Sequence, residues 1–134
     1  MLKRTIFGIL VICLALALAT GCSGKSAEEE EAGAAPTGEM LFKQATIGNQ
    51  PGCSTCHSLE AGVTIVGPSL AGIGSQAGEL VSGLSAEEFL RQSILEPNAY
   101  VTEGFAANIM PATWGDALSQ EQVDDLVAFL LTLK

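Results

Sequence analysis

The sequence predicts a small all-α domain in which helices and loops wrap around a bound group. Segments with helical spacing of apolar residues stand at the start, middle and end of residues 37–134. Between the first two lies a glycine-rich stretch, 47–83, which has the composition of a loop. A loop this long is hard to order without a cofactor, and three modest helices give a thin core. A large apolar group in the middle would resolve both problems.

The chain begins with the pattern of a secretory signal. Lys3 and Arg4 precede an uncharged run from Thr5 that ends in small residues. The apolar stretch 6–19 would extend about 21 Å as a helix, whereas the hydrocarbon core of a membrane is roughly 30 Å thick. A spanning helix is therefore the weaker interpretation, and we predict a signal peptide at 1–21.

The end of this segment, "LATGC", resembles the lipobox of bacterial lipoproteins, although Ala19 stands where Leu is commoner. The resemblance implies that cleavage exposes Cys22 as a lipidated first residue. The mature protein would then be anchored on the outer, extracytoplasmic face of a bacterial membrane. The alternatives are an uncleaved signal anchor, or cleavage that leaves Cys22 as a free thiol.

Residues 22–36 are predicted to be a disordered acidic tether. After Cys22 they contain four consecutive glutamates and no large apolar side chain, so they cannot offset the entropy of ordering. Without the signal, the chain has four basic and 15 acidic residues, which gives a net charge of 4 − 15 = −11. Nucleic acid and anionic lipid headgroups are poor partners for such a surface, and a basic patch on another protein fits better.

The remaining residues, 37–134, form one predicted domain that starts with a short helix. In "TGEMLFKQAT", Thr37 is the expected N-cap and Met40 is expected in the core beside Leu41. In "LSAEEFLRQSILEP", Ser85 and Glu88 have the spacing of a capping box, and a proline ends the helix.

The last helix has the clearest pattern. In "LSQEQVDDLVAFLLTLK", Ser119 and Gln122 again have capping-box spacing. The apolar residues that follow keep to one helical face: Val123, Leu126, Val127, Leu130 and Leu131.

The chemistry is expected at "CSTCH", which holds Cys53, Cys56 and His57, the only histidine. C-x-x-C-H is the attachment signature of c-type haem, in which the thiols add to the vinyl groups and the imidazole binds iron. A redox dithiol would need a β-α-β setting, and a zinc site would lack a fourth Cys or His in the domain. Chance occurrence is the remaining alternative. An export signal favours haem, because c-type haem is attached outside the cytoplasm.

A second iron ligand is expected from Met110. With one histidine, the other axial position cannot be filled by a second imidazole. Met110 lies in the irregular stretch "NIMPATWG", well placed to be presented from a loop, and a thioether ligand raises the potential towards that of an electron carrier. The alternative is a five-coordinate iron with Met110 merely packing, as in a gas sensor or a peroxidase-like protein.

The order of a short helix, CxxCH, "GPSL", a middle helix and M-P before an amphipathic last helix resembles class I cytochromes c over 37–134. This resemblance implies the small cytochrome c fold with one covalently attached haem, first and last helices that cross, and electron transfer without a small-molecule substrate. It also implies that the Pro68 carbonyl accepts a hydrogen bond from His57 Nδ1. Read without the resemblance, Gly67 and Pro68 make a simple turn.

The segment "RQSILEPNAYVTEGFAANIMP" also resembles the haem domain of subunit II of haem-copper oxidases and the lipid-anchored monohaem subunit of alternative complex III. The implied partners are redox proteins or other subunits of a respiratory or photosynthetic chain. Arg91 has two interpretations, a haem propionate or an i, i+4 pair with Glu87, and we favour the pair. Tyr100 and Trp114 flank the Met110 segment and either line the haem site or belong to the core.

Overall fold

The computed structural model describes residues 37–134. The predicted signal peptide at 1–21, the lipidation of Cys22 and the tether at 22–36 lie outside the described residues. No helix within 37–134 has both the length and the apolar character needed to cross a membrane.

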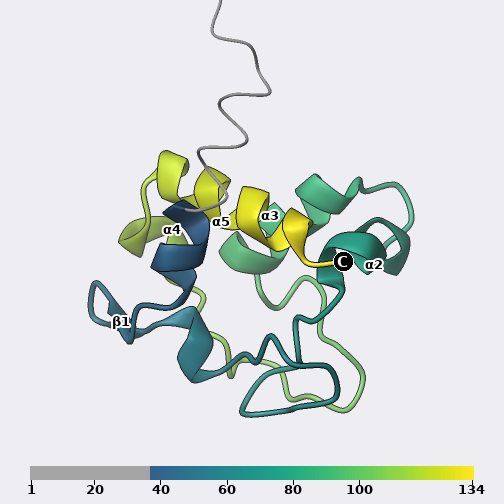
Figure 1. The fold of residues 1–134 in the computed structure, drawn as a ribbon, viewed down its shortest axis with the longest axis horizontal. Helices are drawn as coiled ribbons and strands as arrows, with labels where there is room; N and C mark the ends of the chain where they lie inside the picture. The colour runs from purple at the N-terminus through teal and green to yellow at the C-terminus, as the bar shows by residue number, and fades with distance from the viewer. Residues whose placement is uncertain (1–36) are drawn as a thin grey trace, which may run out of the picture.

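Helices dominate the described chain (Figure 1). In chain order the structure contains a helical segment at 37–42, strands β1 (Thr46–Ile47) and β2 (Gln50–Pro51), the 3₁₀ helix η1 (Cys53–Thr55), and helices α2 (Ile73–Leu80), α3 (Ala86–Leu95), α4 (Trp114–Ala117) and α5 (Gln120–Thr132). The two strands pair antiparallel. The predicted all-α class is confirmed, with this small ribbon as an addition.

The predicted middle and last helices, α3 and α5, are confirmed together with their starts. Ser85 Oγ accepts from the backbone N–H of Glu88 at 3.2 Å, and the Glu88 carboxylate accepts from the N–H of Ser85 at 2.8 Å. Ser119 and Gln122 make the same exchange at 3.2 and 2.9 Å. Both helices therefore begin where a local side-chain bond satisfies their first free N–H groups.

Helix α2 corrects the prediction that 47–83 is loop throughout. Its sequence, IGSQAGEL, contains two glycines, and its N-cap Gly72 has no side chain to accept a hydrogen bond. The helix is instead stabilised by packing against α3 and α5. Ala77 is fully buried there, so tertiary contacts outweigh a weak local propensity.

The segment 37–42 lies against α5 at a close helix crossing (Figure 1). A side chain at Gly38 would collide with the backbone carbonyl of Asp125, so only glycine permits this approach. Beside it the rings of Phe42 and Phe129 pack at a centroid distance of 5.6 Å. The first and last helices thus meet as the family resemblance implies.

Two predictions for this first helix are wrong. Met40 was expected in the core but is 66% exposed, because Leu41 and Phe42 take the face of the short helix that is turned inward. Thr37, the expected N-cap, is already helical.

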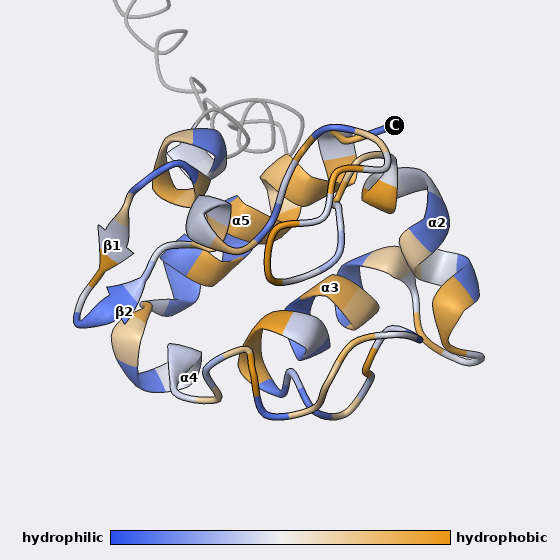
Figure 2. Ribbon diagram, turned by 90° about the horizontal axis from the view of Figure 1, so that it is seen from below, coloured by the Kyte–Doolittle hydropathy of each residue, from blue (hydrophilic) through white to orange (hydrophobic). Residues whose placement is uncertain are grey.

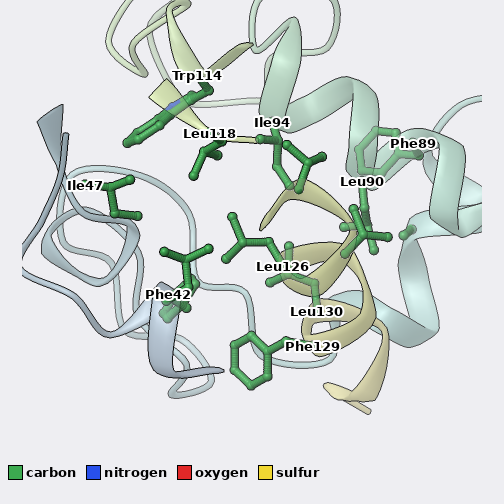
Figure 3. Close-up of a cluster of buried hydrophobic side chains, with 14 residues drawn as sticks. Phe42, Ile47, Phe89, Leu90, Ile94, Trp114, Leu118, Leu126, Phe129 and Leu130 are labelled. Atoms are coloured by element: carbon green, nitrogen blue, oxygen red, sulfur yellow. The ribbon is translucent and has the colours of Figure 1, made fainter. Parts of the chain in front are cut away.

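The core forms where 37–47, α3 and α5 meet. Figure 3 shows side chains from these three regions, among them Phe42, Ile94 and Leu126, converging with Trp114 from α4. Full burial of one such side chain contributes about 1.5–3 kcal/mol. Several residues of this core, among them Phe42, Ile94 and Leu126, also line the cavity described below.

Candidate functional site

A cavity of about 370 Å³ lies between the core and the two long loops, 56–72 and 96–113. Helices α3 and α5 supply part of its wall. No Asp, Glu, Lys or Arg of the described residues lines it. Figure 2 looks onto the side where the loops lie and shows hydrophobic stretches along them. A concave, largely apolar space of this kind is the usual setting of a bound organic group.

Cys53, Cys56 and His57 line one part of this cavity. The N–H groups of Cys56 and His57 both donate to the Cys53 carbonyl, at 3.1 and 2.9 Å, which closes a tight turn at η1. Both thiols are free and half-buried. Burial raises the pKa of the Cys53 thiol, so it is uncharged at neutral pH. The turn thus presents two thiols and an imidazole to the same space.

The His57 ring is fixed from two sides. Its Nδ1 lies 2.9 Å from the Pro68 carbonyl, and since a carbonyl only accepts, Nδ1 carries the proton and Nε2 keeps a lone pair for a metal. The N–H groups of Val66 and Gly67 donate to the Cys56 carbonyl and hold this loop in place. A side chain at Gly67 would stand 2.5 Å from His57 Cε1, so glycine is required for the ring to lie there.

Met110 lines the same cavity from the loop 96–113. It is half-buried and packs against the hydrophobic core. The structure therefore brings a soft sulfur donor to the space that holds Cys53, Cys56 and His57. Met40, the other methionine of the described chain, does not line this cavity.

Trp114 shows what kind of group the cavity fits. It lines the cavity, is 3% exposed, and its Nε1 is the only buried side-chain N or O atom within residues 37–134 without a hydrogen-bond partner. Such an unpaired donor costs about 1–3 kcal/mol, which an acceptor on a bound group would offset. No cluster of three metal-binding side chains exists among the described residues. Haem fits this site, because it brings its own equatorial ligands and carries carboxylates.

Arg91 lies outside the cavity, and its predicted pair with Glu87 is confirmed at 3.3 Å. It also binds Asp124 of α5 at 2.6 Å, which ties α3 to α5 and, through this hydrogen bond, lowers the pKa of Asp124. Tyr100 lines the cavity, and its ring meets that of Phe89 edge-on at 5.2 Å. Trp114 is both core and cavity wall, so the two interpretations of that residue are compatible.

Asn98 and Asn108 are two cavity-lining residues that the sequence analysis missed. The N–H of Asn108 donates to Asn98 Oδ1 at 2.8 Å. Asn108 has a positive φ of 63°, a conformation that asparagine tolerates better than most residues. The sequence does show an asparagine, Asn108, two residues before Met110. It does not show that Asn98 is its hydrogen-bond partner, because that depends on the path of the loop.

Fold and site together define a small haem-binding domain with a single attachment motif. The family model "Cytochrome c" matches residues 35–134, and the chain belongs to the cytochrome c family. Cytochrome c2 iso-1 of Magnetospirillum fulvum is 32% identical over 94 residues, which cover 61% of this chain and 91% of that protein. No solved structure matches significantly. The cofactor is therefore one covalently attached c-type haem, and the protein is an electron-transfer protein.

Proposed function

We propose that Cys53 and Cys56 would attach the haem through thioether bonds and that His57 Nε2 and Met110 Sδ would bind its iron. The observation that carries this assignment is that all four residues line one uncharged cavity. The bound haem supplies a one-electron couple, and methionine ligation raises its potential.

The other residues of the site orient the ligands and exclude water. Pro68 fixes the tautomer of His57 through the 2.9 Å hydrogen bond to Nδ1. Trp114 Nε1 is available to donate to a haem carboxylate. The apolar lining keeps the surroundings of the iron at low polarity, which is one of the means by which a protein sets a haem potential.

The iron ligation separates this function from the runner-up, a haem-based gas sensor or peroxidase-like protein with an open distal site. The purified holo-protein is reduced, mixed with carbon monoxide and followed by absorption, and the oxidised form is scanned for the weak long-wavelength band of sulfur-to-iron charge transfer. We expect the band and very slow carbon monoxide binding. Absence of the band, together with rapid binding, would favour the open-site function.

We further propose that the protein is exported and held on the outer face of a bacterial membrane through lipidated Cys22. The signal pattern at 1–21 and the lipobox-like "LATGC" support this proposal. The 14 residues 23–36 reach at most about 46–50 Å when extended, so a domain on such a tether stays close to membrane-bound partners. Membrane fractionation tests it: wild type should sediment with membranes, and Cys22→Ser should not.

Its partners are proposed to be neighbouring subunits or redox proteins of a respiratory or photosynthetic chain, docked over the cavity mouth. An aliphatic rim, defined as Val63, Ile65, Val66 and Ile109, is between 41% and 58% exposed, and its last two members also line the cavity. No Lys or Arg occurs in 44–90 or 92–133, which include both long loops. The expected partner surface is therefore apolar with a basic surround.

Oxidation of the reduced protein by membranes of the source organism tests this docking face. Ile65→Asp places a charge in the aliphatic rim at a residue that does not line the cavity, and should slow the reaction at least about tenfold, the factor for a loss of about 1.4 kcal/mol, without changing the potential. Met40→Asp is the matched control, because Met40 is also an exposed apolar residue but belongs neither to the rim nor to the cavity lining. Equal rates for the two variants would exclude the rim as the docking face.

A further inference from the structure

The loop that carries Met110 is fastened to the rest of the fold at one point. The N–H of Asn108 donates to Asn98 Oδ1 at 2.8 Å, and both residues line the cavity. Within the described residues 37–134, it is the only hydrogen bond made by 106–112. Met110 follows two residues after the donor, so this bond is the nearest polar restraint on its position.

The acceptor end of the bond is attached to a rigid element. Asn98 follows Pro97, which stands two residues after the end of α3 and whose ring restricts the backbone. The Ala99 N–H donates to Glu96 O at 2.8 Å and closes a turn there. The Glu96 N–H donates to Gln92 O at 2.6 Å and joins this turn to the end of α3. Since α3 packs against both α2 and α5, this turn ties the backbone of Asn98 to the helical core.

The donor end adopts a backbone conformation that needs support. Asn108 is the only non-glycine residue in the described chain with a positive φ, 63°. Such a conformation persists where its surroundings determine it, and asparagine adopts it at lower cost than most residues. The hydrogen bond from the Asn108 N–H to Asn98 Oδ1 is the polar contact that supports this conformation.

We propose that Asn98 is a positioning residue that keeps Met110 in place as an iron ligand by accepting the hydrogen bond of Asn108. This inference rests on the proposed function, because it requires Met110 to be the ligand. Removal of the acceptor should raise the population of the displaced loop about fivefold, the factor that corresponds to the typical net worth of one hydrogen bond, about 1 kcal/mol.

Three variants of the holo-protein isolate the role of the acceptor oxygen. Asn98→Leu keeps the size but removes the oxygen, Asn98→Asp keeps an oxygen, and Glu103→Gln changes an exposed residue of the same loop that does not line the cavity. The measurements are the carbon monoxide binding rate of the reduced protein, the long-wavelength band of the oxidised protein, and the hydrogen-exchange rate of the Asn108 amide. In Asn98→Leu, we expect both carbon monoxide binding and hydrogen exchange of the Asn108 amide to be about fivefold faster than in wild type. Asn98→Asp and Glu103→Gln should match wild type in both rates.

The outcomes distinguish this inference from the proposed function. If wild type shows the band but Asn98→Leu leaves both rates unchanged, the positioning role is overturned while Met110 remains the ligand. If Asn98→Asp behaves like Asn98→Leu, the oxygen is not the cause and the role is likewise overturned. If wild type itself lacks the band and binds carbon monoxide rapidly, the proposed ligation fails and this inference with it. Should Asn98→Leu not fold, Asn98→Ala at this exposed position provides the same comparison.

Discussion

The two sides of the cavity are held in different ways. Around His57, the N–H groups of Val66 and Gly67 donate to the Cys56 carbonyl. The N–H of Leu70 donates to the Ser58 carbonyl at 2.8 Å, and the imidazole itself is hydrogen-bonded to a carbonyl. Around Met110, residues 106–112 make a single hydrogen bond within the described chain. The histidine side is thus fixed by its backbone, whereas the methionine side depends on one side chain and on apolar packing.

This difference suggests a division of labour in an electron carrier. A fixed histidine and two thioether bonds would keep the haem in the protein through every redox cycle. Under the proposed ligation, the position of Met110 on its lightly held loop would depend on a single residue, Asn98. Mutations should therefore cause loss of haem on one side and loss of ligation on the other.

The largest effect is expected when the histidine side loses its anchors. In the double variant Cys53→Ser and Cys56→Ser, no thioether bond can form, so all covalent attachment should be lost. Haem staining after denaturing electrophoresis measures this directly, with wild type as the positive lane. Haem that stays with the denatured double variant would contradict the assignment of both cysteines.

A large but confined effect is expected on the methionine side from Met110→Leu. The change nearly conserves volume, so packing should cost less than about 1.5 kcal/mol, but it removes the sulfur donor. Haem should remain attached, carbon monoxide should bind rapidly to the reduced protein, and the midpoint potential should fall. Redox titration and carbon monoxide mixing provide the readouts, and an unchanged potential would contradict ligation by Met110.

A moderate effect is expected from Gly67→Ala, because the added methyl would press on the His57 ring at 2.5 Å. Overpacking of this kind costs about 1–3 kcal/mol, measured as the free energy of unfolding of the holo-protein in denaturant. Gly78→Ala is the matched control: its added methyl would meet Ala86 N at an ordinary 3.5 Å, and alanine favours a helix over glycine. Equal stability of the two variants would mean that the His57 side is not as closely fitted as the structure indicates.

The smallest effect is expected outside the cavity, at the Arg91–Asp124 bridge. The hydrogen bond from Arg91 lowers the pKa of Asp124, so its stabilisation is present above the ordinary pKa of 3.8 and is lost as pH falls through the lowered value. Asp124→Asn should cost less than about 1 kcal/mol at pH 7, since the pair is partly exposed to solvent. Unfolding titrations from pH 7 to about 2 should show the difference from wild type vanish in acid. Glu79→Gln, which alters an exposed residue in no ion pair of the described chain, is the matched control.

Much of the fold could be predicted because its signals are local. Each capping box, at Ser85 and at Ser119, joins residues three positions apart, and the apolar periodicity of α5 lies within that one helix. Helix α2 has no such signal, because its glycines favour loop and its stability comes from packing. Met40 was misplaced for a related reason: a short helix of mixed residues does not show which face turns inward.

The site divides in the same way. Cys53, Cys56 and His57 stand out in the sequence because the attachment chemistry requires adjacent residues. Met110 could be assigned because few soft donors exist in the domain. The bond between Asn98 and Asn108 could not be predicted, since it joins a side chain to a backbone N–H across a loop whose path depends on the rest of the fold.

The central claim, that Met110 completes the iron ligation opposite a fixed His57, is tested most directly by proton NMR of the reduced holo-protein. A methionine methyl bound to haem iron lies in the ring current of the macrocycle. We predict a three-proton resonance far upfield of ordinary methyl groups, which disappears in Met110→Leu. A spectrum of folded, haem-loaded wild type without this resonance would contradict the account.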